Sequence, residues 1–566
     1  MPRMTARLAR PLIASLMLSG LCSLATAQTP GADPSISPGA IQQQQQEDTR
    51  RRAQEERVLT TPEAPEISVP AGGPDTTDGQ EIRIEVSQIL VDKSALLDPA
   101  AIDAIISPLE GKTVTLARIK EAVAAINALY AEGGHATARA ILPPQTIKDG
   151  MVRIRLIEAR VGEVRVRDTQ YLHPDFVLER VQLEAGELLS VRALEQALVR
   201  FNRLHEDKLR ASVVAGKGFG TTDVELSVVE QRRARLSVFF DNGGRDTVGE
   251  TRAGLNARFT NLLGRSDALQ FIATRTQGSE NYALSYAVPL LPNGLKLELS
   301  TSKGNIKIID GPFEPLNITG SSEDHTVGLS YPLQVTLQDL WSVYGRFSAR
   351  ASATEFGGFT QSEQNLRVLT LGVSGERQTD DVAWYLDNSL AFGISGILGG
   401  DEGFWYYRGS ATRFDRLTER FQLLTRGGLQ FSDTRFLPSS ELYQIGGAYT
   451  VRGFSEGLIS GRNGYFASIE LRFGRTLEEY QAADPDAPEL TGLVFLDHGG
   501  ALPYRPGNLK ESTHDDYLTS AGAGVIFNVS DRVTGRFVVA QPLRGNPAEL
   551  HDRRPRAHVS VNIALY

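Results

Sequence analysis

Residues 464–473 read Gly-Tyr-Phe-Ala-Ser-Ile-Glu-Leu-Arg-Phe, a ten-residue segment in which apolar and polar side chains alternate. Alternation with a period of two is typical of a β-strand with one apolar face. Similar short segments recur after residue 231, with Gly, Asn and Asp between them; examples are residues 235–240, 255–259, 269–273, 295–299, 369–373, 384–390 and 533–539. The C-terminal part of the chain is therefore expected to consist of β-strands.

The spacing of these segments favours a closed transmembrane barrel over residues 232–566. Roughly 335 residues, at about 20 residues per strand and turn, give about 16 antiparallel strands, which is enough to enclose a lumen. A large soluble β-sandwich or propeller would show the same alternation, although no blade-length repeat is evident. The barrel is favoured because the N-terminal half resembles that of an exported, periplasmic protein.

The N-terminus indicates export from the cytoplasm. Three arginines within residues 1–10 precede an uncharged apolar run, residues 12–24, which is followed by Ala25-Thr26-Ala27. This pattern predicts a signal peptide over residues 1–27; a membrane anchor, the alternative, needs about 20 apolar residues. The only cysteine, Cys22, lies in this segment, so the mature chain is expected to have neither disulfides nor Cys-ligated metals.

Residues 28–57 are expected to be an N-terminal extension. Residues 41–57 are rich in Gln, Glu and Arg and lack an apolar stripe. They predict either a helix that is polar all round, in solvent or in a polar cavity, or a disordered Gln-rich linker. Residues 58–79 contain four prolines and are expected to be a linker.

Residues 80–159 and 160–231 repeat one order of elements: strand, helix, helix, strand, strand. In each unit the second helix has apolar residues at three- and four-residue spacing, around Ile119–Ile126 in the first and Leu194–Leu198 in the second. Two units with the same order rarely arise by chance. A single α+β domain of about 150 residues is the alternative.

Four motifs follow one another along the chain. Residues 190–204 with the loop 216–223 come first, and Asp241-Asn242-Gly243-Gly244, followed by Tyr286 and Pro289-Leu290, comes second. The third is Ile445-Gly446-Gly447 with Val451-Arg452-Gly453-Phe454, and the fourth is Phe495-Leu496-Asp497-His498-Gly499. Together they resemble the TpsB transporters of two-partner secretion, which export haemolysins and filamentous adhesins and belong to the outer-membrane assembly-factor superfamily.

The resemblance implies α+β periplasmic POTRA domains, at 80–159 and 160–231, followed by a transmembrane antiparallel β-barrel in the bacterial outer membrane. It implies that the polar segment 41–57 is a plug helix in the barrel. The expected partner is a large secreted exoprotein of TpsA type, received in extended form by the POTRA domains, by pairing with a strand edge or in a groove. The protein would also contact outer-membrane lipid and depend on the barrel assembly machinery for insertion.

Other functions remain as alternatives. An outer-membrane assembly factor shares the V-R-G-F/Y loop but usually has more POTRA domains and no plug helix. A passive porin or a ligand-gated receptor would have no POTRA units.

The resemblance places Val451, Arg452, Gly453 and Phe454 at the tip of a loop inside the lumen, and Phe495, Asp497 and Gly499 on an inner barrel strand. A confined guanidinium needs a carboxylate partner because it cannot lose its charge. We therefore expect a bidentate Arg452–Asp497 pair that holds the loop. The simpler alternative makes Arg452 a solvated loop residue and Asp497 a turn residue.

Neither enzymatic activity nor a cofactor is expected. The eight histidines show no metal-binding spacing, and no nucleophile-elbow sequence occurs. The net charge of −9 argues against a nucleic-acid partner. Without a nucleotide site, the energy for export is expected to come from folding of the exoprotein outside the cell. One departure from the usual barrel ending is that Tyr566 does not share the alternating face of Val559 and Leu565.

Overall fold

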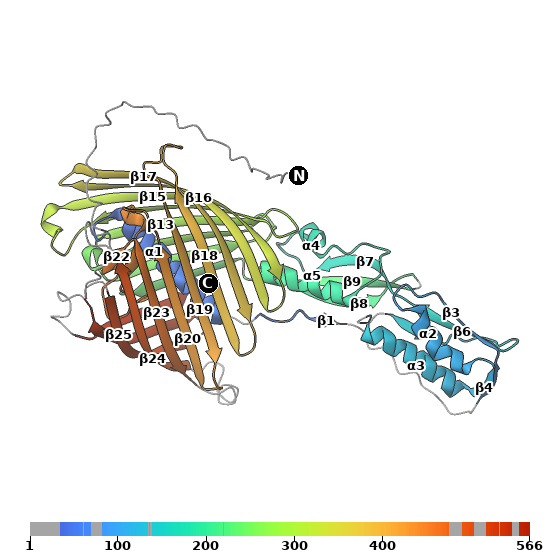
Figure 1. The fold of residues 1–566 in the computed structure, drawn as a ribbon. Coiled ribbons are helices and arrows are strands. Elements are labelled where there is room, and N and C mark those ends of the chain that lie inside the picture. Colours follow the sequence, from blue (N-terminus) through green and yellow to red (C-terminus); the bar gives the residue numbers. More distant parts are fainter. Residues whose placement is uncertain are drawn as a thin grey trace, which may run out of the picture.

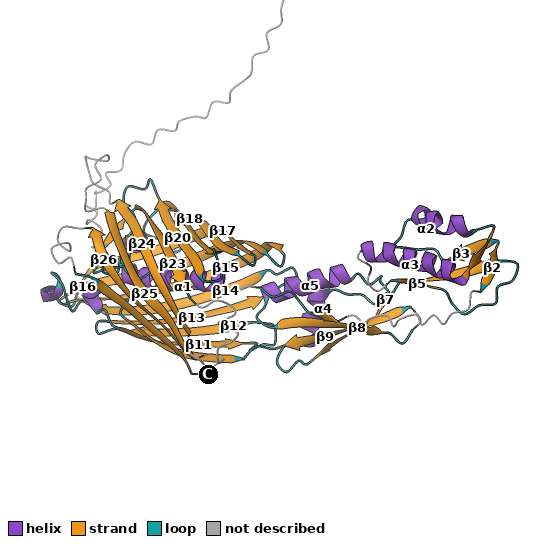
Figure 2. Cartoon of the chain, turned by 90° about the horizontal axis from the view of Figure 1, so that it is seen from below, coloured by secondary structure: helices purple, strands orange, loops and turns teal. Residues whose placement is uncertain are grey.

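The computed structural model describes residues 34–59, 62–68, 82–133, 135, 138–218, 220–474, 489–502, 517–530, 532–545 and 554–565. The expected signal peptide and Tyr566 lie outside these residues. A closed barrel lies at one end of the molecule, and an elongated arm of two α/β units extends from one of its rims (Figures 1 and 2).

The barrel has 16 antiparallel strands, and its first and last strands, β10 and β27, pair to close it. The predicted fold class and strand number are confirmed. The strands are β10 (Ala234–Asp241), β11 (Arg252–Thr260), β12 (Ala268–Arg275), β13 (Ser279–Pro289), β14 (Lys296–Lys307), β15 (Ile318–Val335), β16 (Asp339–Phe356), β17 (Phe359–Gln378), β18 (Val382–Gly393), β19 (Phe404–Arg416), β20 (Phe421–Phe431), β23 (Asn463–Phe473), β24 (Glu489–Leu502), β25 (Tyr517–Ser530), β26 (Val533–Arg544) and β27 (Arg556–Ala564).

The outer surface of the barrel is apolar along the middle of its strands. On β24, Val494 and Leu496 are about half exposed on the outside, whereas Phe495 and Asp497 between them are buried on the inside. The three tryptophans of the chain, Trp341, Trp384 and Trp405, lie within three residues of strand ends. Aromatic residues at this position are typical of the interfaces of a membrane.

Helix α1 (Pro38–Leu59) lies inside the barrel (Figure 1). It contacts β14, β15, β16, β18 and β19 on the wall. Its composition explains this position, because a helix without an apolar stripe can pack in a polar cavity but not on an apolar core. Among the described residues, no helix is both long and apolar enough to cross a membrane.

The first arm unit contains β2 (Arg83–Val86), β3 (Gln88–Val91), α2 (Pro99–Ile106), η1 (Ser107–Leu109), β4 (Lys112–Thr115), α3 (Leu116–Glu132), β5 (Arg139–Ile141) and β6 (Met151–Ile157). Its core joins the inner faces of α2 and α3 to β3 and β6. Strand β4, which pairs with β2, was not predicted between the two helices.

The second arm unit contains β7 (Arg160–Arg167), α4 (Pro174–Val181), α5 (Val191–Leu204), β8 (Lys208–Ala215) and β9 (Thr221–Val229). Its sheet has the order β1-β8-β9-β7, and its outer member β1 (Ile67–Ser68) comes from the segment that follows helix α1. Strand β1 runs parallel to β8, and its described residues pair Ile67 with Ala211 and Ser68 with Ser212.

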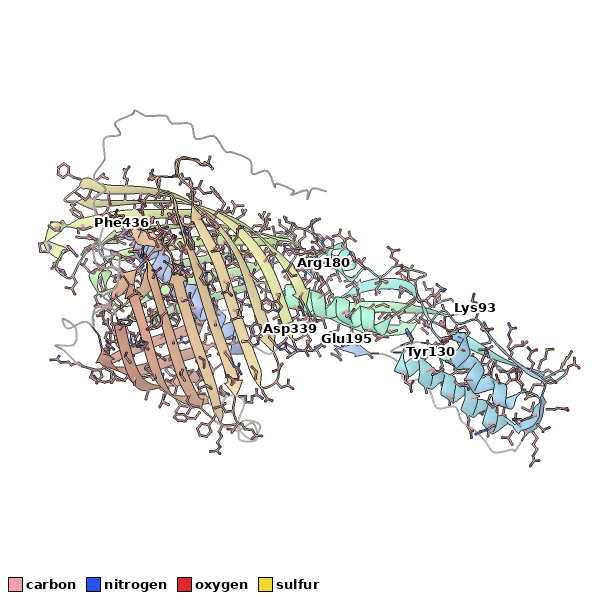
Figure 3. All side chains as sticks on the ribbon, in the orientation of Figure 1. Lys93, Tyr130, Arg180, Glu195, Asp339 and Phe436 are labelled. Carbon is pink, nitrogen blue, oxygen red and sulfur yellow. The ribbon has the colours of Figure 1, made fainter. Side chains whose placement is uncertain are left out.

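The second arm unit is joined to the barrel by arginines of its helices. Arg180 of α4 lies at the junction (Figure 3), where Nη2 donates to the carbonyl of Leu291 at 3.4 Å. Arg203 of α5 forms a salt bridge with Glu376 of β17 at 2.8 Å. These contacts connect α4 and α5 to the ends of barrel strands.

Acid should destabilise the second arm unit through His205. This ring is buried between Phe176 and Phe201, at centroid distances of 5.2 and 4.5 Å. Burial, with the nearby cations of Arg180, Lys208 and Lys296, lowers the pKa of His205 to about 3. The neutral ring therefore contributes stability that is present above the unfolded pKa of about 6.5 and is lost as the pH falls from there towards 3.

At pH 5 the loss should be about 2 kcal/mol. Hydrogen exchange of the α5 amides in the full-length protein, corrected for the intrinsic effect of pH, measures it. His205→Leu keeps an apolar group between the rings and should remove the extra acid sensitivity. An equal acid response in the wild type and this variant would contradict the assignment.

Candidate functional site

A long loop between β20 and β23, residues 432–462, folds back into the barrel. It contains η4 (Ser439–Glu441) and the paired strands β21 (Tyr443–Ile445) and β22 (Ile459–Gly461). The loop packs through Ile445, Val451 and Phe454 on Phe466 and Leu518 of the wall. This apolar contact holds the predicted V-R-G-F segment against the inner surface.

Arg452 at the tip of this loop meets Asp497 of β24. Nε donates to Oδ2 at 2.7 Å and Nη2 to Oδ1 at 2.8 Å, so the pair is bidentate. The backbone N–H of Arg452 also donates to Oδ2, at 3.1 Å. The two side chains are 1% and 0% exposed. A guanidinium buried to this degree needs such partners because it stays charged.

Arg452 has a second carboxylate partner, Glu470 of β23, which the sequence did not point out. Its Nη1 lies 2.5 Å from Glu470 Oε2, and its Nη2 donates to Ser468 at 3.2 Å. Arg472 also binds Glu470, at 2.8 Å. A signal was present, since Ser468, Glu470 and Arg472 occupy alternate positions of the 464–473 segment and therefore share one face.

Phe495 and Gly499, the other members of the fourth motif, complete the seat of Arg452. The Phe495 ring lies under the guanidinium, with the Arg452 Cζ 3.4 Å from its centroid, which adds a cation–π contact. A Cβ on Gly499 would lie 3.1 Å from side-chain atoms of both Ile445 and Val451. The glycine therefore lets the loop approach the wall closely.

Gly453 has φ +88°, a conformation that glycine adopts readily and bulkier residues do not. Its N–H donates to His558 Nε2 of β27 at 2.8 Å, and this contact requires the ring nitrogen to be unprotonated. Phe454 packs beside Gly545 and Leu518. Sequence reasoning missed His558, because nothing near it in the chain indicates its contact with Gly453.

The second motif, at the start of the barrel, helps to close it. The Asn242 side chain donates to the Ala557 carbonyl and accepts from the Val559 N–H, both at 2.8 Å. Asp241 forms a salt bridge with Arg252 at 2.7 Å. The Asn242 hydrogen bonds join the start of the barrel to β27, and the salt bridge joins β10 to β11. Tyr286 donates to Asp267 at 3.1 Å.

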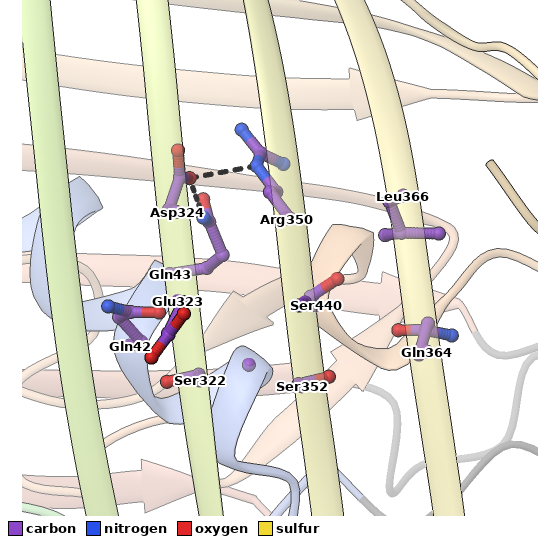
Figure 4. A pocket seen from close by; sticks show the side chains of 12 residues that line it. Gln42, Gln43, Ser322, Glu323, Asp324, Arg350, Ser352, Gln364, Leu366 and Ser440 are labelled. Atoms are coloured by element: carbon purple, nitrogen blue, oxygen red, sulfur yellow. Dashed lines mark hydrogen bonds and ion pairs between the residues drawn. The ribbon is translucent and has the colours of Figure 1, made fainter. Parts of the chain in front are cut away.

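Helix α1 is held in the lumen by polar contacts. Gln42 donates to Ser302 at 2.9 Å, and Glu47 pairs with Arg408 at 2.8 Å. Gln43 donates to Asp324, which Arg350 also binds, beside a narrow pocket (Figure 4). Among the described residues, the helix side chains that belong to buried apolar clusters are Ile41 and Val58, near its two ends.

An open cavity of about 880 Å³ lies at the rim of the barrel that carries the arm. It is lined by the end of α1, residues 62–66, α5, β8 and the barrel residues Leu337, Glu376 and Gln378. In the described part of the chain, no group of three or more His, Cys, Asp or Glu side chains is placed to hold a metal ion. The arrangement offers a channel, an arm and a closing helix.

Family comparisons agree with this architecture. A family model described as haemolysin secretion/activation protein ShlB/FhaC/HecB matches residues 220–527, and a model for the ShlB-type POTRA domain matches residues 84–159. The haem/haemopexin transporter protein HuxB of Haemophilus influenzae is 23% identical over 82% of this chain and 85% of that protein. The outer membrane transporter CdiB of Escherichia coli is 27% identical over 86% of this chain and 82% of that protein.

Solved structures share the fold. CdiB from Escherichia coli aligns with a TM-score of 0.65 and 22% identity, covering 96% of this chain and 100% of that chain. BamA from Haemophilus ducreyi lacking POTRA domains 1–3 aligns with a TM-score of 0.54 and 15% identity, covering 86% and 100%. The BamA likeness is one of fold alone. The chain belongs to the haemolysin secretion/activation family ShlB/FhaC/HecB and is an outer-membrane transporter of two-partner secretion, with its POTRA region in the periplasm.

Proposed function

We propose that the arm receives a secreted exoprotein of TpsA type in extended form and that the exoprotein crosses the outer membrane through the barrel once helix α1 has left the lumen. The observation that carries this proposal is the polar helix in the lumen. Its hydrogen bonds and ion pairs can be exchanged for contacts with water. The helix therefore closes the channel mainly through polar contacts, with apolar packing at Ile41 and Val58 near its ends.

The edge of the second arm unit is a suitable place for the exoprotein to pair. Within the described residues, strand β8 carries on that edge the two-residue strand β1. It is held by the pairing of Ile67 and Ser68 and by the Ala211 N–H, which donates to the Glu66 carbonyl at 3.0 Å. An extended segment of the exoprotein that displaced β1 would form a longer ladder. Because β1 follows α1 in the chain, its displacement would also free the segment that leads to the helix.

The Arg452–Asp497 pair is proposed to hold the loop as part of the channel wall. Removing one partner of a buried ion pair leaves the other charge without compensation. The carboxylates at Asp497 and Glu470 would then no longer fix the loop tip. Insertion into the membrane, which we ascribe to the barrel assembly machinery and to the apolar outer face, does not use this contact.

Arg452→Ala should reduce secretion of the exoprotein about tenfold or more while leaving the amount of inserted barrel unchanged, because the loss of a buried partner costs about 3–5 kcal/mol. Exoprotein in the medium and heat-modifiable barrel in the membrane fraction are the two measurements. Arg462→Ala is the matched control, since Arg462 of the same loop binds the carbonyl of Thr434 at 3.1 Å. Wild-type secretion by Arg452→Ala would contradict the role given to the pair.

Locking the helix should stop transport. The hydroxyls of Ser37 and Ser439 lie 2.8 Å apart, so cysteines at these two positions would be close enough to form a disulfide between the start of α1 and the loop. Under oxidising conditions the double variant Ser37→Cys/Ser439→Cys should secrete about tenfold less exoprotein, and a reductant should restore secretion. Each single variant is the control. Full secretion by the oxidised double variant would show that the helix does not have to leave.

A further inference from the structure

Three arginines on the barrel wall converge on one carboxylate of helix α1, that of Glu55. Arg426 of β20 lies 3.3 Å from Glu55 Oε2, and Arg536 of β26 lies 3.6 Å from Oε1. Arg472 of β23 contacts Oε1 as well. We call Arg426, Arg472 and Arg536 the arginine cluster. The side chains of these arginines are 5%, 5% and 21% exposed. The Glu55 carboxylate is therefore bound at a largely buried site in the wall.

The carboxylates of the wall itself are already shared among several arginines. Glu470 binds Arg452 and Arg536, both at 2.5 Å, in addition to Arg472. Asp497 is engaged by Arg452. With the helix in place, four arginines face three carboxylates; without Glu55 they would face two. Arginine cannot lose its proton in a protein, so this excess charge would have to be matched in another way.

Of the three arginines in the cluster, Arg426 relies most on helix α1 for a carboxylate partner. Among the described residues its hydrogen-bond partners are Glu55 and Ser468, the latter at 3.3 Å, and its Nε is buried without a partner. Departure of Glu55 would therefore leave this guanidinium with a hydroxyl alone. Arg472 and Arg536 would each keep Glu470. The vacated position is thus a receptor for one further carboxylate.

The position of the cluster suits contact with a chain that enters from the periplasm. Arg472 is the next-to-last residue of β23, at the end opposite the returning loop, and Arg536 is the fourth residue of β26. Both lie in the half of the barrel that carries the arm. A planar guanidinium group binds a carboxylate through two parallel hydrogen bonds. It binds a neutral amide more weakly, because hydrogen bonds to an ionised acceptor are the stronger ones.

We propose that the arginine cluster is a carboxylate-binding site that Glu55 fills while α1 is in the lumen and that aspartate or glutamate side chains of the extended exoprotein fill during transport. This inference rests on the proposed release of the helix. The wall then never has to bury an uncompensated cation, because one carboxylate replaces another. Acidic residues of the exoprotein would compete with the return of the helix.

Channel recordings of the full-length Ser37→Cys/Ser439→Cys variant in planar bilayers test this proposal. Reduction of the disulfide should open the channel. A Gly-Ser peptide that carries glutamates, added on the arm side, should then block the current about tenfold longer per event than the same peptide with glutamines. Arg426→Gln should remove this difference. Arg346→Gln should keep it, because Arg346 of β16 lies outside the cluster and pairs with Glu298 at 3.3 Å.

Other outcomes separate the proposals. If reduction does not open the channel, both the release of the helix and the carboxylate site are wrong. If the channel opens but the two peptides block equally, the site is wrong while release stands. If inorganic phosphate abolishes the difference at the concentration of peptide glutamate, the site takes any anion and its assignment to side-chain carboxylates fails.

Should Arg426→Gln not give a heat-modifiable barrel, Glu55→Gln replaces it in the same disulfide background. This change leaves the arginines of the wall intact and weakens only the binding of helix α1 to them. It should raise the open probability after reduction and leave the block by the glutamate peptide unchanged. An unchanged open probability would contradict the proposal that the helix and the peptide compete for the arginine cluster.

Discussion

The buried guanidinium of Arg452 is the constraint around which the inner wall is arranged. Because it cannot discharge, the protein supplies two carboxylates, a hydroxyl and an aromatic face within contact distance of it. This requirement fixes two barrel strands, β23 and β24, and the returning loop relative to one another. Two nearby glycines let the loop reach this position. Gly453 adopts a φ of +88° in the turn, and Gly499 has no side chain that would hold the loop away from the wall.

Helix α1 follows from the same polarity of the lumen. A barrel that turns its apolar residues to lipid must line its interior with polar ones. A helix that occupies the interior must then be polar all round, and α1 meets the wall mainly through Gln, Glu and Arg. Such hydrogen bonds contribute little net free energy, because the same groups can bind water when the helix leaves. The helix can therefore close a channel and still be removed, which an apolar plug could not.

Glu55 connects helix α1 to the ion pairs that hold the tip of the returning loop. It shares Arg472 and Arg536 with Glu470, and Glu470 in turn binds Arg452. The position of the helix and the electrostatic balance around the loop tip are thus parts of one network. At the rim of the barrel that carries the arm, the segment after the helix pairs through Ile67 and Ser68 with the edge of the second arm unit.

The sequence by itself determined the barrel, its approximate strand number, the absence of an apolar stripe on α1 and the chemical needs of Arg452, because alternation, composition and residue type are local properties. The direction in which Ser468, Glu470 and Arg472 point was also present in the alternation of residues 464–473. Only the tertiary structure decided that Glu470 meets Arg452, that Glu55 enters the arginine cluster, and that His558 accepts from Gly453. It also decided that β4 pairs with β2 and β1 with β8. These contacts join residues far apart in the chain, and they depend on strand register and on the closure of β10 upon β27, which alternation does not specify.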